Sequence, residues 1–372
     1  MKKEVGVIMS VLKPVDDTRM YEKMAQSLVG TGKFSVNIIG FYSNTHTASS
    51  DISFYPIFNF KAQQLIRLLA NFQVFRLMLR IKPNFIIVTT PELAPAVLLY
   101  KSVYSRVRLF YDTRENHSRN IVYHHQKQKR ARKWLARLID KLEQQLARRS
   151  GCLLVAEQGY YQEKPWLVDF SAVLLENKVI PLTQPLARKV KQENLCLLYS
   201  GTISDVYGIW EALSLAKQLY QALRNRMVFR LIGHVTQLAT YHKLQAIASD
   251  NPWIQSTISL SPVPHGQLLE AMQESDFGMV CHRILPSIEN CFPTRIWEYM
   301  NYELPFFLQD HSPWVEYCQP WQCAVPINFS QSDWPIEKVV EKVERTRFYP
   351  RGKPLDIYWE GHKFISVIDK SS

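Results

Sequence analysis

Short apolar runs of four to six residues recur along this chain, and longer segments with helical spacing separate them. The first series of runs occupies residues 5–9, 36–41, 85–89, 108–111 and 152–155. Runs that are short and continuously apolar are typical of strands buried on both faces, as in a parallel sheet. Because parallel neighbours need a crossover helix between them, this alternation predicts an α/β fold with a doubly wound parallel sheet.

A second series begins at residue 195, after a polar stretch over 177–194 that contains Pro181 and Pro185. Its strands are expected at 195–201, 228–232, 277–280 and 305–308. The 372 residues are enough for two such domains in tandem, each Rossmann-like. Open parallel sheets bind ligands at the carboxyl ends of their strands, so we expect the two domains to face each other across a cleft.

Several motifs of other chemistries are absent. There is no G-x-G-x-x-G after a strand, no G-x-x-x-x-G-K-[ST], no H-E-x-x-H and no G-x-S-x-G, which disfavours nicotinamide, P-loop, zinc-protease and α/β-hydrolase sites. No Asp-x-Asp pair offers ligands to a metal, and the six cysteines lack zinc spacing. We expect no metal, and an anionic ligand held by helix ends and basic side chains.

The strongest local signal is the block P-T-R-I-W-E-Y-M at residues 293–300. Its Pro-Thr favours a helix start, which places Arg295 in the first turn and Glu298 one turn later on the same face. A helix N-terminus beside a guanidinium can bind a diphosphate, and a nearby carboxylate can accept both hydroxyls of a ribose. The same residues are equally compatible with a helix cap and an ordinary i,i+3 ion pair.

This block resembles the donor-site signature of GT-B glycosyltransferases, in particular the retaining family 4 group that assembles bacterial surface polysaccharides. Further segments match that group in the right order: V-D-D-T-R at 15–19, Y-D-T-R-E at 111–115, Y-S-G-T-I at 199–203, L-I-G-H at 231–234 and P-V-P-H at 262–265. The resemblance covers about residues 5–310. It implies an acceptor domain over 1–178, a nucleotide-sugar donor domain over 179–334, and a segment over 335–372 that crosses back to the first domain.

The resemblance also assigns site residues by position. Glu298 is expected on the ribose and Arg295 on the diphosphate, while Gly201 and Thr202 form the phosphate loop. The remaining expected donor-binding residues are Gly233, His234, Val263, Pro264 and Thr294, of which His234, Val263 and Pro264 surround the base. The expected catalytic residues are Asp17, Arg19, Asp112, Glu115 and Asn290. Asp17 and Arg19 could equally form a surface helix cap and its partner.

Four positions depart from the family pattern, and one of them is Lys13, which sits where the related group often has His. Asn290 stands where the first Glu of a Glu-x7-Glu pair is usual, and Arg114 stands where His is common. The proton or hydrogen-bond donor of the acceptor domain then has to come from Glu115, His117, Asp17 or the substrate. The Lys that often follows the phosphate loop is missing, which leaves Arg295 as the main cation for the diphosphate.

The implied function is transfer of a sugar from a nucleoside diphosphate sugar to a glycan or polyprenyl-linked acceptor, in polysaccharide or glycoconjugate synthesis. Retention in this group is described as a front-face displacement, in which the leaving diphosphate assists the incoming hydroxyl. Such a reaction needs positioning and neutralisation of the leaving group, and neither an enzyme nucleophile nor a metal or other cofactor. A catalytically weakened scaffold, a nucleotide-sugar epimerase of the same architecture and a nucleic-acid-binding protein are the alternatives; nucleic acid is not expected.

The formal charge of +12 lies in two segments, 61–82 (+5) and 124–149 (+7), over a neutral remainder. Both have apolar residues at helical spacing, so each could be a helix with one core face and one solvated basic face. Basic residues near anionic lipid contribute about 1 kcal/mol each, which makes an anionic membrane surface the favoured partner of these helices. No apolar run reaches the roughly 18 residues of a spanning helix. We therefore expect a cytoplasmic protein, peripheral on the inner face of the cell membrane.

Overall fold

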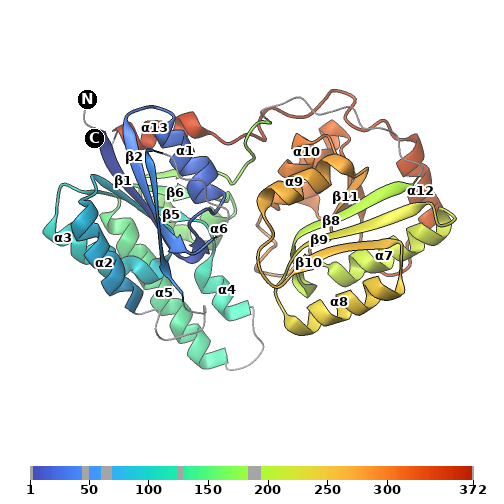
Figure 1. The fold of residues 1–372 in the computed structure, drawn as a ribbon, viewed down its shortest axis with the longest axis horizontal. Helices are drawn as coiled ribbons and strands as arrows, with labels where there is room; N and C mark the ends of the chain where they lie inside the picture. Colours follow the sequence, from blue (N-terminus) through green and yellow to red (C-terminus); the bar gives the residue numbers. More distant parts are fainter. Residues whose placement is uncertain (1–2, 44–49, 60–68, 124–128, 183–193, 371–372) are drawn as a thin grey trace. The chain divides into compact units, whose positions relative to one another are not determined.

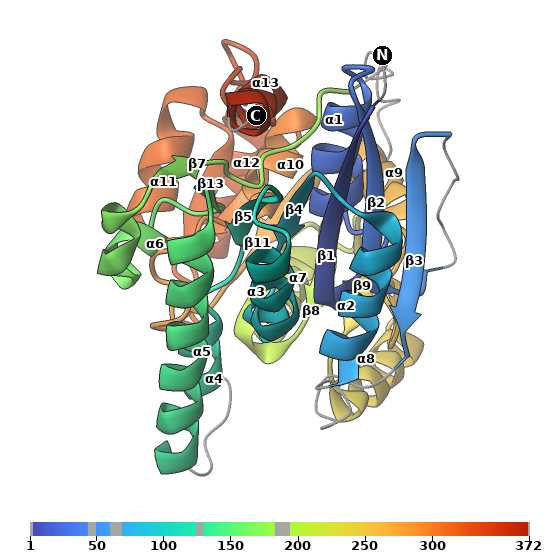
Figure 2. The same ribbon diagram turned by 90° about the vertical axis from the view of Figure 1, so that its left-hand side faces the viewer.

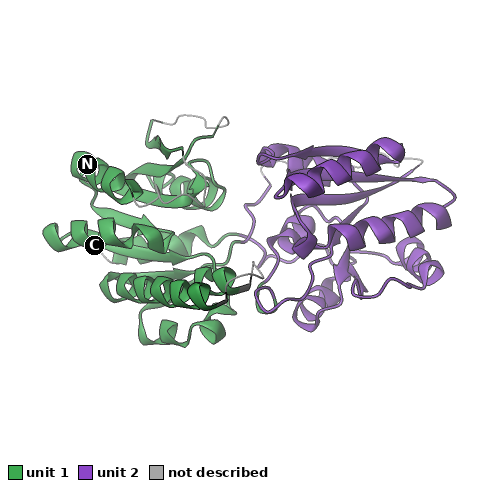
Figure 3. Ribbon diagram, turned by 90° about the horizontal axis from the view of Figure 1, so that it is seen from below, with its two compact units in different colours: residues 1–177, 289–291, 359–372 green, residues 178–288, 292–358 purple. Residues whose placement is uncertain are grey.

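The computed structural model describes residues 3–43, 50–59, 69–123, 129–182 and 194–370 (Figure 1). They form two compact units, shown in different colours in Figure 3. Unit 1 comprises Met1–Asn177, Glu289–Cys291 and Trp359–Ser372, and unit 2 comprises Lys178–Ile288 and Phe292–Tyr358. Most of the polar stretch expected to link the domains, at 183–193, lies outside the described residues.

Unit 1 is built on a parallel sheet with the strand order β3-β2-β1-β4-β5-β6-β7. Its strands are β1 (Glu4–Pro14), β2 (Phe34–Phe41), β3 (Ile52–Phe58), β4 (Phe85–Val88), β5 (Arg108–Thr113), β6 (Cys152–Val155) and β7 (Ala172–Leu174). The central strand β4 is buried along its whole length, as its continuous apolar run predicts. The two edge strands, β3 and β7, were not expected from the sequence, because half-exposed edge strands lack that run.

Helices cover both faces of this sheet, so the prediction of a doubly wound fold is confirmed. One face packs against α2 (Leu69–Ile81), α3 (Ala94–Val103) and α5 (Lys129–Arg149). The other packs against η1 (Arg19–Ala25), a π-helical turn that continues into α1 (Gln26–Val29), and against α13 (Gly361–Lys370). Shorter elements complete the unit: η3 (Pro91–Leu93), α4 (His117–Tyr123), α6 (Tyr160–Glu163) and η4 (Pro165–Asp169).

Unit 2 repeats the design with the parallel strand order β10-β9-β8-β11-β12-β13. The strands are β8 (Leu195–Ile203), β9 (Met227–Val235), β10 (Ile254–Ser259), β11 (Phe277–Val280), β12 (Phe306–Gln309) and β13 (Ala324–Ile327). The helices are η5 (Asp205–Tyr207), α7 (Ile209–Ala222), α8 (Leu238–Asp250), α9 (His265–Glu274), α10 (Thr294–Asn301), α11 (Ser312–Cys318), η6 (Gln319–Trp321) and α12 (Ile336–Arg345). Two apolar cores, one on each face, again enclose the sheet.

The last part of the chain is divided between the units. Helix α12 packs on α7 in unit 2, whereas the residues from Trp359 onward belong to unit 1. There α13 buries Phe364 and Ile368 in the same core as α1. Among the described residues, no helix has both the length and the apolar composition needed to cross a bilayer.

Gly208, the residue before α7, has a backbone that requires glycine, which gives a test of the fold. Its φ is +74°, and a Cβ there would lie 1.9 Å from the carbonyl oxygen of Cys281. We expect Gly208→Ala to lower the free energy of unfolding by about 2 kcal/mol or more, because a left-handed backbone and a backbone clash both disfavour alanine.

Urea denaturation followed by circular dichroism measures the effect. Gly266→Ala in α9 is the matched control, since nothing lies within 4 Å of its new Cβ. There alanine should be neutral or stabilise by up to about 1 kcal/mol. Equal midpoints for the two variants would contradict the requirement at position 208.

Candidate functional site

The carboxyl edge of the sheet in unit 2 brings the expected phosphate loop and base residues side by side. Gly201 on β8 is paired in register with Gly233 on β9, and Thr202 with His234. A Cβ on Gly233 would lie 1.8 Å from the carbonyl oxygen of Gly201, so the two strand ends meet as closely as backbones can. The ends of β8 and β9, which a helix separates in the sequence, therefore lie together at this edge.

Arg295 of α10 lies over the end of β8. A Cβ at Gly201, whose φ is +102°, would be 2.0 Å from Arg295 Nη2, so only glycine lets the guanidinium rest there. Helix α10 begins at Thr294 after Pro293, as predicted, and no side chain caps it. Its first turn thus presents backbone N–H groups that no side chain caps, beside a cation, which is a favourable place for an anion.

Glu298 forms an ion pair with Arg295 one turn along α10. The Thr294 hydroxyl lies 3.4 Å from Glu298 Oε1 and can donate a hydrogen bond to it. Both charged side chains are mostly buried, with 16% and 17% exposed. The i,i+3 pair is therefore real, and the carboxylate holds the guanidinium toward the strand end as a ligand-binding pair would require.

The residues expected around the base lie at the same edge. His234 on β9 is paired in register with Ser259 at the end of β10. After Ser259 the chain continues through Val263 to Pro264, which precedes α9. Val263 is partly buried against the core, and Pro264 is exposed. Burial lowers the pKa of His234, so its imidazole is neutral at neutral pH.

Charged residues in the last positions of β1 and β5, and just after these strands, pair with one another in unit 1. The Arg19 guanidinium donates to both carboxylate oxygens of Asp112, from Nε at 2.9 Å and from Nη2 at 2.6 Å. Its Nη1 donates to the carbonyl of Leu175 at 2.8 Å, and its Cζ lies 5.4 Å from the centre of the Trp359 ring. Arg19 and Asp112 are 1% and 0% exposed, so this pair is part of the core. Asp17 Oδ1 accepts from the backbone N–H groups of Arg19 and Met20 at 3.1 Å, so the alternative of a helix cap holds for Asp17.

Two further ion pairs also join residues near the end of β1 to residues just after β5. Arg114 Nη1 lies 2.8 Å from Asp17 Oδ1, and Lys13 Nζ lies 2.9 Å from Glu115 Oε1. Burial raises the pKa of Asp17, but the Arg114 charge and hydrogen bond outweigh it and hold the pKa at about 2. The Lys13 charge lowers the pKa of Glu115 to about 2 as well. Both carboxyl groups are ionised at neutral pH, so in this state neither can supply a proton.

His117, another of the expected hydrogen-bond donors, begins α4. It is 8% exposed, and its buried Nε2 has no hydrogen-bond partner among the described residues. The structure therefore places the His117 imidazole close to Glu115, at one end of the three ion pairs.

Asn290 belongs to unit 1, whereas Arg295 and Glu298 belong to unit 2. Its Nδ2 donates to Glu163 Oε1 at 3.2 Å, and a Cβ on Gly159 would be 2.1 Å from its carbonyl oxygen. Glu163 is 2% exposed and also accepts from Asn116 Nδ2 at 2.6 Å. Sequence reasoning could not anticipate this, because Glu163 carries no motif.

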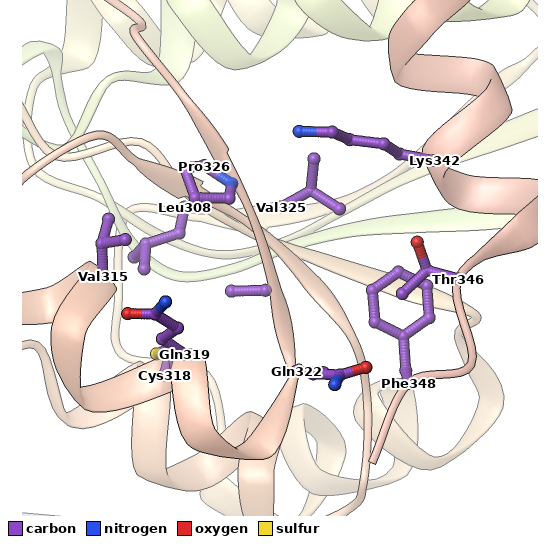
Figure 4. Close-up of a pocket in the computed structure, with 11 residues that line it drawn as sticks. Leu308, Val315, Cys318, Gln319, Gln322, Val325, Pro326, Lys342, Thr346 and Phe348 are labelled. Carbon is purple, nitrogen blue, oxygen red and sulfur yellow. The ribbon is translucent and has the colours of Figure 1, made fainter. Parts of the chain in front are cut away.

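A cavity of about 240 Å³ lies elsewhere in unit 2, between β12, β13, α11 and α12 (Figure 4). Its lining is mostly apolar: Leu308, Val315, Cys318, Gln319, Gln322, Ala324, Val325, Pro326, Lys342, Thr346 and Phe348. None of the expected site residues contributes to it, so this space is separate from the chemistry discussed above. Among the residues with described side chains, no three His, Cys, Asp or Glu gather as they would around a metal ion.

Comparison with known proteins identifies the fold. No protein-family model and no curated protein matches the sequence. Among solved structures, sucrose-phosphate synthase from Thermosynechococcus elongatus matches with a TM-score of 0.64 and 11% identity, over 99% of this chain and 94% of its own. The catalytic domain of starch synthase IV from Arabidopsis thaliana, bound to ADP and acarbose, gives 0.61 and 11%, over 100% and 99%.

A putative UDP-N-acetylglucosamine 2-epimerase from Listeria monocytogenes also matches, with a TM-score of 0.59 and 8% identity, over 99% of this chain and 96% of its own. Similarities at such low identity concern the fold. The expected pair of Rossmann-like domains, the GT-B fold, is confirmed. The roles of the individual site residues stay predictions.

The lowered pKa values of Asp17 and Glu115 predict sensitivity to acid. Their folded values, about 2, lie below the ordinary values of 3.8 and 4.5. The unfolded chain therefore takes up protons first as the pH falls, so the stabilisation is complete above about pH 5 and is lost progressively toward pH 2. We expect the free energy of unfolding to decline over this range, and to decline less in Asp17→Asn.

Urea titrations at a series of pH values measure the decline. Asp250→Asn, at the exposed end of α8, is the control and should follow the wild type. The assignment to Asp17 is wrong if both variants decline as steeply as the wild type.

Proposed function

We propose that this protein is a glycosyltransferase that moves a sugar from a nucleoside diphosphate sugar to an acceptor hydroxyl, with retention, as in family 4. The observation that carries the proposal is the Arg295 guanidinium resting on Gly201 at the carboxyl edge of a GT-B donor domain. Glu298 lies beside it on α10, where a ribose could use the carboxylate. The solved structures named above include two sugar synthases of this fold.

The chain's own groups suit a reaction limited by departure of a diphosphate. Arg295 and the uncapped N-terminus of α10 would neutralise the charge that develops on the leaving oxygen. The leaving group would in turn accept the proton of the attacking hydroxyl, so the ionised state of Asp17 and Glu115 is no obstacle. Neither a metal nor another cofactor enters this scheme.

A basic and partly apolar surface on unit 1 suggests where the acceptor resides. Helix α5 buries Ala136, Ile139 and Leu146 in the core, yet a second apolar group on it, Trp134, Leu135 and Leu138, is exposed by 66%, 42% and 39%. Lys133, Arg137 and Lys141 are exposed around that group. A helix with a core face and a second apolar face among basic residues is suited to the interface of an anionic membrane.

The neighbouring helices extend this surface. Helices α2, α3 and α5 lie side by side in Figure 2, and α3 contacts both of the others. Exposed side chains on α2 include Phe72, Arg76 and Arg80, and exposed side chains on α3 include Leu99 and Val103. Residues 61–68 and 124–128 of the two basic segments lie outside the described residues. We infer a glycan or polyprenyl-linked acceptor, in polysaccharide or glycoconjugate synthesis, at the cytoplasmic face of the cell membrane.

The proposal predicts loss of nucleotide binding and turnover in Arg295→Ala. A hydrogen bond to a charged group is worth about 1.5–3 kcal/mol, so affinity for the matching nucleoside diphosphate should fall about 10-fold or more. Thermal shift with UDP, ADP and GDP identifies the nucleotide, and release of that diphosphate from its sugar nucleotide measures turnover. Glu298→Ala should also lose turnover.

Arg345→Ala is the matched control, because Arg345 forms an exposed pair with Glu341 on α12. It should behave as the wild type does. Wild-type turnover in Arg295→Ala would refute the site. Rearrangement of the sugar nucleotide without transfer would identify an epimerase, and binding without turnover a scaffold.

The membrane surface predicts binding to vesicles of phosphatidylglycerol and phosphatidylcholine, but not to phosphatidylcholine alone, at low salt. Trp134→Ser should reduce the bound fraction several-fold in a flotation assay, since it removes the largest exposed apolar group of α5. Leu238→Ser, which changes a 56% exposed side chain on α8 of unit 2, should not. A wild-type protein that stays unbound at low salt would end the membrane proposal.

A further inference from the structure

His282 follows β11 at the carboxyl edge of the sheet in unit 2, and no sequence motif selects it. Its imidazole lies between two aromatic rings in edge-to-face geometry, with centroids 4.8 Å away for Tyr207 and 6.0 Å away for Trp314. Tyr207 belongs to the turn after β8, and Trp314 belongs to α11. Elements from three parts of the chain thus fix the orientation of this ring.

The two ring nitrogens of His282 have different surroundings. Nδ1 is buried and has no hydrogen-bond partner among the described residues. The residue as a whole is only partly buried, and Nε2, unlike Nδ1, is not among the fully buried side-chain atoms that lack a partner. An N–H group buried without an acceptor is costly, which favours the tautomer with its hydrogen on Nε2. The ring therefore carries its N–H donor at Nε2.

This donor is uncharged, and it follows β11, the strand that pairs with β8, over whose end the Arg295 guanidinium lies. Burial, together with the Arg295 charge, lowers the pKa of His282 to about 3. The same guanidinium has its Nη2 over Gly201. An anion bound there would meet a cation and a neutral N–H donor together, and the neutral donor adds a hydrogen bond without repelling the cation.

We propose that His282 binds the diphosphate of the nucleotide donor, donating its Nε2–H to a phosphate oxygen beside Arg295. The inference rests on the proposed function and adds a diphosphate-binding residue to it. It also accounts for how the phosphates are held in a chain that lacks a lysine after the phosphate loop. Tyr207, in the turn that follows that loop, is the residue against which the imidazole packs.

Isothermal titration with UDP, ADP and GDP, and with each parent nucleoside, tests the contact. His282→Leu should weaken the matching diphosphate about 10-fold or more and the nucleoside less than about 2-fold, because only the phosphates lose a hydrogen bond. His282→Gln should stay within about 3-fold of the wild type, since its amide N–H can take the place of Nε2–H. His242→Ala, at an exposed position of α8, is the control and should change neither affinity.

Each other outcome overturns the proposal in a distinguishable way. Unchanged diphosphate affinity in His282→Leu shows that the contact is absent, while the proposed function stands. Equal weakening of nucleoside and diphosphate shows that His282 only supports the fold. If the wild type binds none of the three diphosphates, the proposed function fails together with the inference.

Discussion

A parallel sheet must be covered on both of its faces, and most features of this protein follow from that constraint. Central strands such as β4 and β11 are apolar throughout because helices enclose them on each side. A few polar side chains are buried beside the sheet, such as the pair Glu143–Lys164, but others collect at the carboxyl edge, where the strands end in loops. Both units therefore carry their charged and polar clusters there, although the clusters differ in kind.

The cluster of unit 1 is already neutralised by its own residues. Arg19 and Asp112 are almost wholly buried, and such a pair is tolerated because every polar group finds a partner, including the carbonyl of Leu175. Removing one member would leave an uncompensated buried charge, at a cost of about 3–5 kcal/mol. The ion pair of these two residues joins the end of β5 to the segment after β1. Its main contribution is therefore to the stability of the fold.

The cluster of unit 2 is arranged differently. Arg295 and Glu298 are paired but partly exposed, and the guanidinium lies against a backbone that has no side chain in the way. A ligand with a negative charge and vicinal hydroxyls could use both groups without breaking a buried network. This difference is why the donor side of the proposed reaction rests on unit 2, whereas unit 1 offers the three ion pairs, a buried His117 and a basic outer surface.

Much of the fold could be predicted from the sequence because burial leaves a signature in it. The strands enclosed by helices were recognised from their apolar runs, and the start of α10 from Pro293 and Thr294. The edge strands β3, β7, β10 and β13 were not recognised, since they are not enclosed along their whole length as the central strands are. The helical spacing after residue 19 predicted a helix but not that its first turns are π-helical. An α-helix and a π-helix both place apolar residues three to five positions apart, so the spacing does not distinguish them.

The sequence by itself determined the two-domain α/β architecture and the Arg295–Glu298 pair on one face of α10, since these depend on local spacing. Only the tertiary structure decided which charges neutralise each other. Asp17 meets Arg114, and Asn290 meets Glu163, across 97 and 127 positions of the chain. It also decided that His282 and Arg295 lie at the same edge of one sheet. Such pairings depend on which strand ends the sheet order brings together, and no local pattern in the sequence records that order.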